Sequence, residues 1–101
     1  MNTGIPEAVL EKLRQVFRGH EEVLEAILYG SRAKGTHHSG SDIDIVLSGK
    51  EDLDFGVLIR VMTDVEELLL PYTVDLAILG NLRKPALLDH ISRVGVRVYR
   101  R

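Results

Sequence analysis

Two aspartates separated by one residue, Asp42 and Asp44, are the side chains of this sequence best suited to chemistry. They open the run DIDIVL at residues 42–47, whose apolar content is typical of a half-buried strand. Alternate side chains of a strand share a face, so both carboxylates point one way while the isoleucines point into a core. Two like charges this close repel each other unless a cation lies between them, and oxygen ligands suit Mg²⁺. The spacing therefore predicts a divalent-metal site on this strand.

A glycine-serine pair, Gly30-Ser31, lies ten residues before the aspartates and directly after an apolar run. Glycine lets the backbone approach a ligand closely, and serine offers both a hydroxyl and a main-chain N–H. We expect Ser31 to cap a short helical turn whose free amides face an anion, with Arg32 and Lys34 adding positive charge. The pair predicts a phosphate-binding turn. For the two cations, a solvated place on the loop is the alternative to a phosphate contact.

Taken together, Gly30-Ser31, ten residues and Asp42-x-Asp44 resemble the signature of the DNA polymerase β-like nucleotidyltransferase superfamily. At this length the chain is most similar to the minimal nucleotidyltransferases, the MNT group, whose members are often antitoxins of helical HEPN proteins. The resemblance covers most of the chain, from the first expected helix to the last expected strand. It implies a palm-like α/β fold (α+β) with a small mixed β-sheet and helices packed on one face. The face that carries the aspartates would stay open for a nucleotide.

The family usually has a third carboxylate on a neighbouring strand, and Asp75 is the candidate. It is the only charge in the strand-like run at residues 73–79, which follows Pro71 and ends before Gly80. The apolar residues on either side of Asp75 would face the core, which leaves the carboxylate on the other face. Asp75 then lies beside Asp42 and Asp44 if the two strands are neighbours.

The resemblance implies Mg²⁺-dependent nucleotidyl transfer. Ser31 and nearby amides would hold the β- and γ-phosphates of ATP, while Asp42 and Asp44 hold Mg²⁺. A second Mg²⁺, shared with Asp75, would activate an acceptor hydroxyl, and Asp75 is also the candidate base. The implied acceptor is a tyrosine of a HEPN-type toxin, which AMPylation would silence. A small molecule or an RNA end is an alternative acceptor, and a non-catalytic nucleotide- or partner-binding module is the alternative from a different class.

Length and composition set limits on these hypotheses. We expect residues 1–101 to form a single domain, which buries somewhat over ~60% of its unfolded surface and leaves no room for an acceptor lobe. The absence of cysteine excludes disulfides and thiolate zinc sites. A net charge of −2 gives no support for a nucleic-acid surface, and the sequence has neither a membrane-length apolar run nor a signal-peptide pattern. We therefore expect a cytoplasmic protein with a protein partner; a homo-oligomer stays open.

Helical and strand-like patterns alternate along the chain, which favours an α/β sheet over separate layers. The hydrophobic periods and the Pro and Gly boundaries predict helices over residues 6–18, 53–70 and 84–93, and strands over 23–29, 43–47, 73–79 and 96–99.

Other conspicuous side chains have simpler interpretations. We expect His37 and His38 to be exposed on a polar loop, because nothing near them completes a zinc site. Tyr29, at a strand end, is expected in the core rather than stacked on a base. The basic end with Arg97, Arg100 and Arg101 is expected to be a solvated tail, with a partner contact as the alternative.

Overall fold

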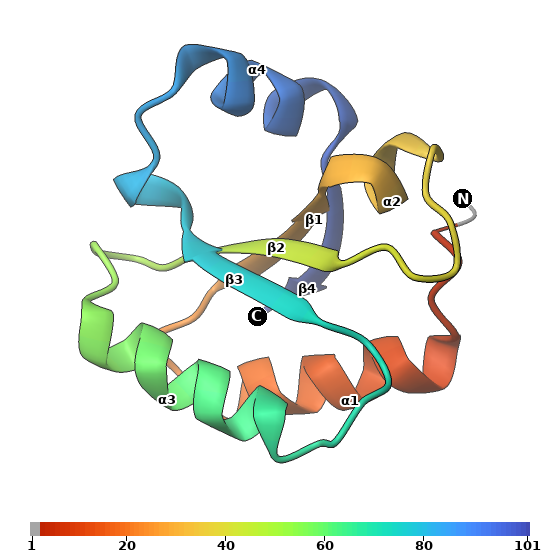
Figure 1. Cartoon of the computed structure of the whole chain (residues 1–101). Coiled ribbons are helices and arrows are strands. Elements are labelled where there is room, and N and C mark those ends of the chain that lie inside the picture. Colours follow the sequence, from red (N-terminus) through yellow and green to blue (C-terminus); the bar gives the residue numbers. More distant parts are fainter. Residues whose placement is uncertain (1–2) are drawn as a thin grey trace.

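Helices and strands alternate along the chain, as the hydrophobic periods predict. The computed structural model describes residues 3–101 and places a four-stranded sheet between helices on both of its faces (Figure 1). In chain order the elements are α1 (Glu7–Arg18), β1 (Glu25–Tyr29), α2 (Gly30–Lys34), β2 (Ile43–Ser48), α3 (Phe55–Glu66), β3 (Val74–Ile78), the 3-10 helix η1 (Leu79–Asn81), α4 (Pro85–Val94) and β4 (Val96–Arg100). None of the helices within residues 3–101 is both long enough and apolar enough to cross a membrane.

The sheet is mixed, as expected, with the strand order β3-β2-β1-β4. Strand β1 runs antiparallel to both of its neighbours, β2 and β4, whereas β2 and β3 are parallel. A parallel pair needs a crossover connection, and α3 provides it. The mixed α/β class is therefore confirmed.

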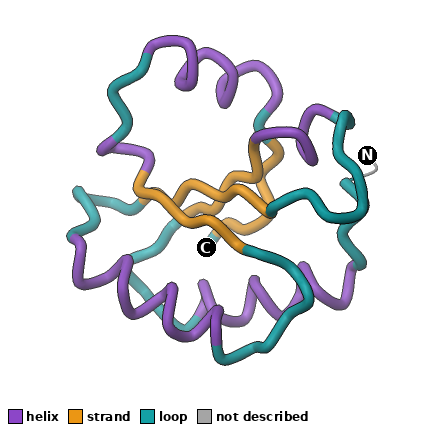
Figure 2. The backbone as a smooth tube through the Cα atoms, in the orientation of Figure 1, coloured by secondary structure: helices purple, strands orange, loops and turns teal. Residues whose placement is uncertain are grey.

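One face of the sheet is covered by α1 and α3, and the main core lies there (Figure 2). Both helices turn an apolar stripe toward the sheet, and the alternate strand residues on this face meet it. The core side chains with no exposed surface are Leu13, Phe17, Val23, Ala26, Leu28, Ile43, Ile45, Leu47 and Val61.

Helix α3 ends earlier than its apolar pattern predicts. Its start is fixed by Asp54, whose Oδ1 accepts the Val57 N–H at 2.8 Å. It ends at Glu66 instead of continuing to residue 70. The helix cannot continue to residue 70 because Leu69 adopts the left-handed conformation, with φ +54°, and its side chain is exposed. The apolar period continues into this turn although the helix does not.

Helix α4 corrects the expectation that all helices pack on one face. It lies on the opposite side of the sheet from α1 and α3 (Figures 1 and 2). Ile27 and Val46 are paired across β1 and β2 on that side, and Val46 is buried, as is Ile91 of α4. Because these strand residues are apolar, they need a cover, and α4 provides it over part of the sheet. The remainder of this face carries the aspartates.

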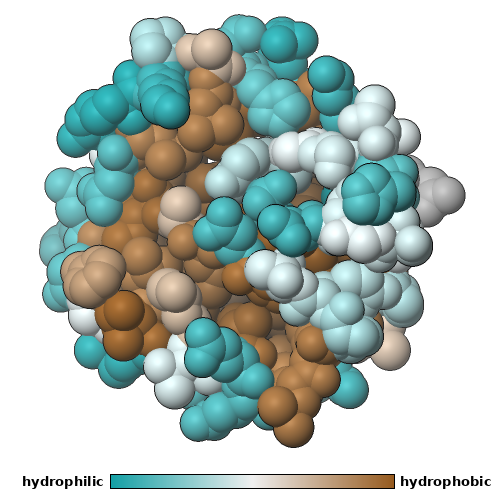
Figure 3. All heavy atoms as spheres, viewed as in Figure 1, coloured by the Kyte–Doolittle hydropathy of each residue, from teal (hydrophilic) through white to brown (hydrophobic). Residues whose placement is uncertain are grey.

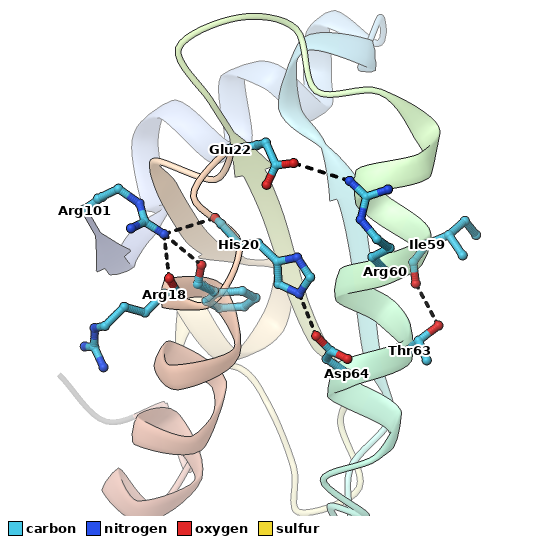
Figure 4. Close-up of polar contacts among 9 residues, drawn as sticks. Arg18, His20, Glu22, Ile59, Arg60, Thr63, Asp64 and Arg101 are labelled. Carbon is cyan, nitrogen blue, oxygen red and sulfur yellow. Dashed lines mark hydrogen bonds and ion pairs between the residues drawn. The ribbon is translucent and has the colours of Figure 1, made fainter.

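The end of the fold remote from the aspartates is held by polar contacts (Figure 4). Arg101 corrects the expectation of a solvated tail, because its guanidinium donates to four main-chain carbonyls, those of Phe17, Arg18, His20 and Val23. Two of these carbonyls, those of Phe17 and Arg18, lie in the last turn of α1, where helix carbonyls lack intrahelical partners. His20 in turn contacts Asp64 of α3, with Nε2 and Oδ2 2.6 Å apart. These contacts tie α1, α3 and the last strand together.

Candidate active site

Asp44 and Asp75 lie side by side on the face of the sheet away from α1 and α3. The parallel register of β2 and β3 pairs the two residues directly, at a strand spacing of about 4.8 Å. The antiparallel register of β1 and β2 pairs Tyr29 with Asp44, so the phenol shares this face. Alternation along each strand explains the arrangement, because the neighbours Ile43, Ile45 and Leu76 all point into the core. The strand adjacency on which the role of Asp75 depends is therefore present.

Asp42 differs slightly from expectation, because β2 begins at Ile43 and leaves Asp42 on the loop before it. Its side chain is exposed, as is that of Asp75, whereas Asp44 is half-buried. The pKa of Asp44 is raised, first by burial and then by repulsion from Asp75 and Asp42. The pKa of Tyr29 is raised too, by burial and then by the charges of Asp44 and Asp75. The four groups thus share one electrostatic environment.

The donor set fits a hard divalent cation such as Mg²⁺. In the described part of the chain, no three His, Cys, Asp or Glu side chains are already close enough together to hold a metal. However, Asp42 and Asp75 are exposed, and exposed side chains change rotamer freely. The repulsion that raises the pKa of Asp44 is the repulsion that a cation among the carboxylates would remove. Asp42, Asp44 and Asp75 are therefore the residues that would hold Mg²⁺ here.

The glycine-serine turn packs directly against Asp44. Gly30 has φ +77°, and a Cβ atom at this position would lie 2.5 Å from Asp44 Oδ2. Only glycine fits such a backbone conformation so close to the carboxylate. Helix α2 begins at Gly30, so Ser31 lies in its first turn and does not cap it as expected; the residue before the helix is Tyr29. The turn closes at Gly35, whose N–H donates to the Ser31 carbonyl.

The two cations of α2 have different surroundings. Lys34 is exposed, which suits either a solvated place or a contact with a bound anion. Arg32 is buried, with 1% of its surface exposed, so the interpretation of a solvated loop cation is wrong for this residue. Its guanidinium donates to main-chain carbonyls of Thr3, Ser39 and Ser41.

His90 of α4 reaches the site, although no pattern in the sequence indicates that it does. Its Nε2 accepts the Gly30 N–H at 3.0 Å, and its ring lies edge-on to Tyr29 with the ring centroids 6.5 Å apart. Sixty residues separate the bonded pair, so only the fold brings them together. Tyr29 is half-buried on the site face and not in the core as expected, and His37 is also half-buried, whereas His38 is exposed as expected.

The surface around the aspartates combines polar and apolar regions. Hydrophilic residues gather near the centre of the face shown in Figure 3, below α2, and hydrophobic residues extend from there toward α4 and α3. A groove of about 260 Å³ lies between the end of α3 and β3, with Met62, Leu69, Tyr72 and Val74 among its lining residues. This groove runs beside the strand that carries Asp75.

Several solved structures share this fold. A chain in the crystal structure of a toxin-antitoxin with AMP-PNP gives a TM-score of 0.72 at 24% identity, over 91% of this chain and 73% of that chain. A chain in the structure of the tri-AMPylated Shewanella oneidensis HEPN toxin in complex with MNT antitoxin gives 0.69 at 19% identity, over 94% and 72%. The MntA-HepT toxin-antitoxin gives 0.69 at 18% identity, over 95% and 74%. Comparison with curated proteins gave no match.

The sequence comparison with protein families is more specific than the likeness of fold. Residues 11–101 match the family described as Polymerase beta, Nucleotidyltransferase. The matched range contains the glycine-serine turn, all three aspartates and every strand of the sheet. Because this match extends over most of the chain, the protein belongs to the polymerase beta nucleotidyltransferase family, as its signature residues predict.

Proposed function

We propose that this protein is a Mg²⁺-dependent nucleotidyltransferase that transfers AMP from ATP to a tyrosine hydroxyl of a HEPN-type partner and thereby acts as its antitoxin. The observation that carries the proposal is the pairing of Asp44 with Asp75 on one face of the sheet, with Gly30 packed against the Asp44 carboxylate. The turn proposed to bind the anion and the carboxylates proposed to bind the cation thus lie next to each other. A metal-chelated triphosphate needs both.

Each residue of the site has a role in this reaction. Ser31, through its hydroxyl and main-chain N–H, holds the β- and γ-phosphates, and Lys34 adds a mobile positive charge beside them. Asp42, Asp44 and Asp75 hold Mg²⁺, which, when bound, neutralises phosphate charge and lowers the pKa of the acceptor hydroxyl.

The transfer itself is an in-line displacement. A carboxylate oxygen of Asp75 takes the proton of the tyrosine hydroxyl, whose oxygen forms a bond to the α-phosphorus. The bond from the α-phosphorus to the oxygen that bridges to the β-phosphate breaks, and pyrophosphate leaves. Positioning and charge neutralisation contribute most of the rate, as is usual for transfer of phosphoryl and related groups.

Three observations support a protein acceptor. Several solved structures of similar fold are toxin-antitoxin complexes, one of them with AMP-PNP and another with a tri-AMPylated HEPN toxin. The exposed position of Asp75 leaves it accessible to a group presented by a partner. The apolar groove beside β3 and the exposed Leu69 offer a surface on which a helical partner can pack.

The test is transfer of label from ATP. The protein is incubated with α-³²P-ATP, Mg²⁺ and a purified HEPN-family protein encoded beside it, and label on the partner is located by mass spectrometry. We expect label on tyrosine with the native protein and none with Asp42→Ala or Asp44→Ala. Label that survives both substitutions would contradict the catalytic proposal. A tight complex without transfer would support the non-catalytic binding module, and label on an added aminoglycoside or RNA end but not on the partner would change the acceptor class.

A further inference from the structure

Arg32 is the one charged or polar side chain within residues 3–101 that the fold buries almost completely. Its Nη1 donates to the Thr3 carbonyl at 2.9 Å. Its Nε and Nη2 both donate to the Ser41 carbonyl, at 3.1 and 3.0 Å, and Nη2 also reaches the Ser39 carbonyl at 3.4 Å. The guanidinium carbon lies 5.2 Å from the centre of the Tyr72 ring. The edges of the guanidinium plane thus contact main-chain carbonyls, and one of its faces lies against the Tyr72 ring.

Burial of this charge needs a reason, because removal of a charge from water is costly unless it is paired. None of the ion pairs formed by the described residues involves Arg32. The carbonyl dipoles and the face of Tyr72 stabilise the guanidinium in place of a carboxylate. An apolar side chain of similar size would fill the same volume without any desolvation of charge. What it could not do is hold main-chain carbonyls at fixed positions.

The Ser41 carbonyl that Arg32 binds lies directly before the first aspartate of the site. Arg32 directly follows Ser31, and Ser41 directly precedes Asp42. Two nitrogens of the rigid guanidinium converge on the Ser41 carbonyl, so one side chain fixes the serine turn relative to the first aspartate.

The loop between these residues has contacts of its own, but they are local. The Ser41 N–H donates to the His38 carbonyl at 3.0 Å, the His38 N–H donates to Ser41 Oγ at 2.9 Å, and the Gly40 N–H donates to His38 Nδ1 at 3.1 Å. These bonds shape the tip of the loop. The beginning of the loop is joined to α2 by the Thr36 N–H, which donates to the Ser31 carbonyl at 3.0 Å. Arg32 attaches the other end of the loop, at Ser39 and Ser41, to α2.

We propose that Arg32 is a positioning residue, which holds Asp42 at a fixed separation from Ser31 and does not itself bind phosphate. The inference rests on the proposed function and replaces the expectation of a phosphate contact. With 1% of its surface exposed and three of its nitrogens engaged by carbonyls, the guanidinium has no free face toward a ligand. Arg32 affects the reaction indirectly, because it fixes the loop that positions Asp42.

The test compares Arg32 with Arg101. The Arg101 guanidinium also makes four hydrogen bonds to main-chain carbonyls, but it lies at the end of the fold remote from the aspartates. Arg32→Lys, Arg32→Gln and Arg101→Gln are examined for thermal unfolding, for Mn²⁺ affinity without nucleotide by electron paramagnetic resonance, and for hydrogen exchange in residues 36–42. Mn²⁺ replaces Mg²⁺ because it gives a signal at the same kind of oxygen site. Tyr72→Leu, which removes only the ring beside the guanidinium, is the milder variant if an Arg32 variant fails to fold.

We expect both Arg32 variants to lose Mn²⁺ affinity about tenfold or more and to exchange faster in the loop. Arg32→Lys should lose as much Mn²⁺ affinity as Arg32→Gln, because lysine keeps the charge but lacks the planar guanidinium with its several N–H donors. Arg101→Gln should lower Tm yet keep Mn²⁺ affinity and loop exchange unchanged. Tyr72→Leu should also lower Mn²⁺ affinity and speed loop exchange, but by less than the Arg32 variants do.

Unchanged Mn²⁺ affinity and loop exchange in the folded variants would overturn the inference, above all if ATP affinity alone falls, since that is the behaviour of a phosphate ligand. A native protein that binds no Mn²⁺ would overturn the proposed function instead. Faster loop exchange in the Arg32 variants would still support the positioning of the loop in that case. The two failures are therefore distinguishable.

Discussion

Replacement of Gly30 by alanine tests whether close packing of the turn against Asp44 builds the site. The backbone at Gly30 has φ +77°, and the new Cβ would lie 2.5 Å from Asp44 Oδ2. Real Cβ atoms essentially never approach another heavy atom closer than 3.0 Å, so something must move. The carboxylate is the end of a short side chain and is the easiest part to displace. We expect it to turn away from the position in which it faces Asp75.

The expected effects on stability and on activity differ. An alanine in the left-handed region costs about 1–2 kcal/mol of unfolding free energy. The carboxylate must retreat by about 0.5 Å or more, which is already the tolerance of a catalytic arrangement. A displacement approaching ~1 Å lowers a rate by about 100-fold. Loss of transfer should therefore be much larger than the loss of stability would suggest.

Gly35→Ala is the matched control. Gly35 has φ +85°, but a Cβ there would meet nothing within 4 Å. Urea denaturation should give a similar loss of about 1–2 kcal/mol for both variants, because both suffer the same backbone strain. Transfer of label from ATP should fall about 100-fold for Gly30→Ala and less than about threefold for Gly35→Ala. Equal losses of transfer in the two variants, or full activity in Gly30→Ala, would refute the reasoning.

Substitutions at three further positions test other parts of the account. Asp44→Asn should raise the Tm of the metal-free protein at pH 7 and abolish the gain in Tm on addition of Mg²⁺, because burial, Asp75 and Asp42 raise the pKa of Asp44 and make its ionised form destabilising. The stability that native Asp44 contributes is present at low pH and is lost as the pH rises through the raised pKa, so the Tm difference should disappear in acid; a difference independent of pH would contradict this. His90→Leu should lower the unfolding free energy by about 1–2 kcal/mol, since the Gly30 N–H loses its acceptor, whereas His90→Gln, with an amide oxygen as acceptor, should keep most of the stability and transfer. Leu69→Asn should raise Tm slightly, because asparagine tolerates φ +54° better than leucine and the exposed leucine side chain contributes little packing; a fall in Tm would show that the apolar contact in the groove dominates.

The parts of the site that follow from a strand's alternation could be predicted from the sequence. Asp44 and Asp75 each interrupt an apolar run, and a period of two places each carboxylate opposite the core side chains. That the two strands are direct neighbours in parallel register is a property of the sheet; the family resemblance made the adjacency plausible but did not predict the register. The glycine-serine turn was predicted by residue type, although its detail differs, since Gly30 and not Ser31 begins the helix.

The contacts that span long stretches of sequence could not be predicted. Arg32 stands on a polar turn, where a cation is usually solvated, and only the folded loop brings the carbonyls of Ser41 and Thr3 around it. His90 reaches Gly30 because α4 packs on the face of the sheet expected to be open. The apolar side chains of Ile27 and Val46 on that face were the available signal for a covering helix. In the sequence they look like ordinary strand residues.

Anomalous diffraction from crystals grown with Mn²⁺ and AMP-PNP tests the central claim most directly. If Asp42, Asp44 and Asp75 hold the cations of a triphosphate bound at Ser31, the map should show two manganese peaks about 3.5–4 Å apart among these three carboxylates, with the phosphates against the first turn of α2. A bound nucleotide with no manganese at the aspartates, or manganese peaks in another part of the molecule, would contradict it.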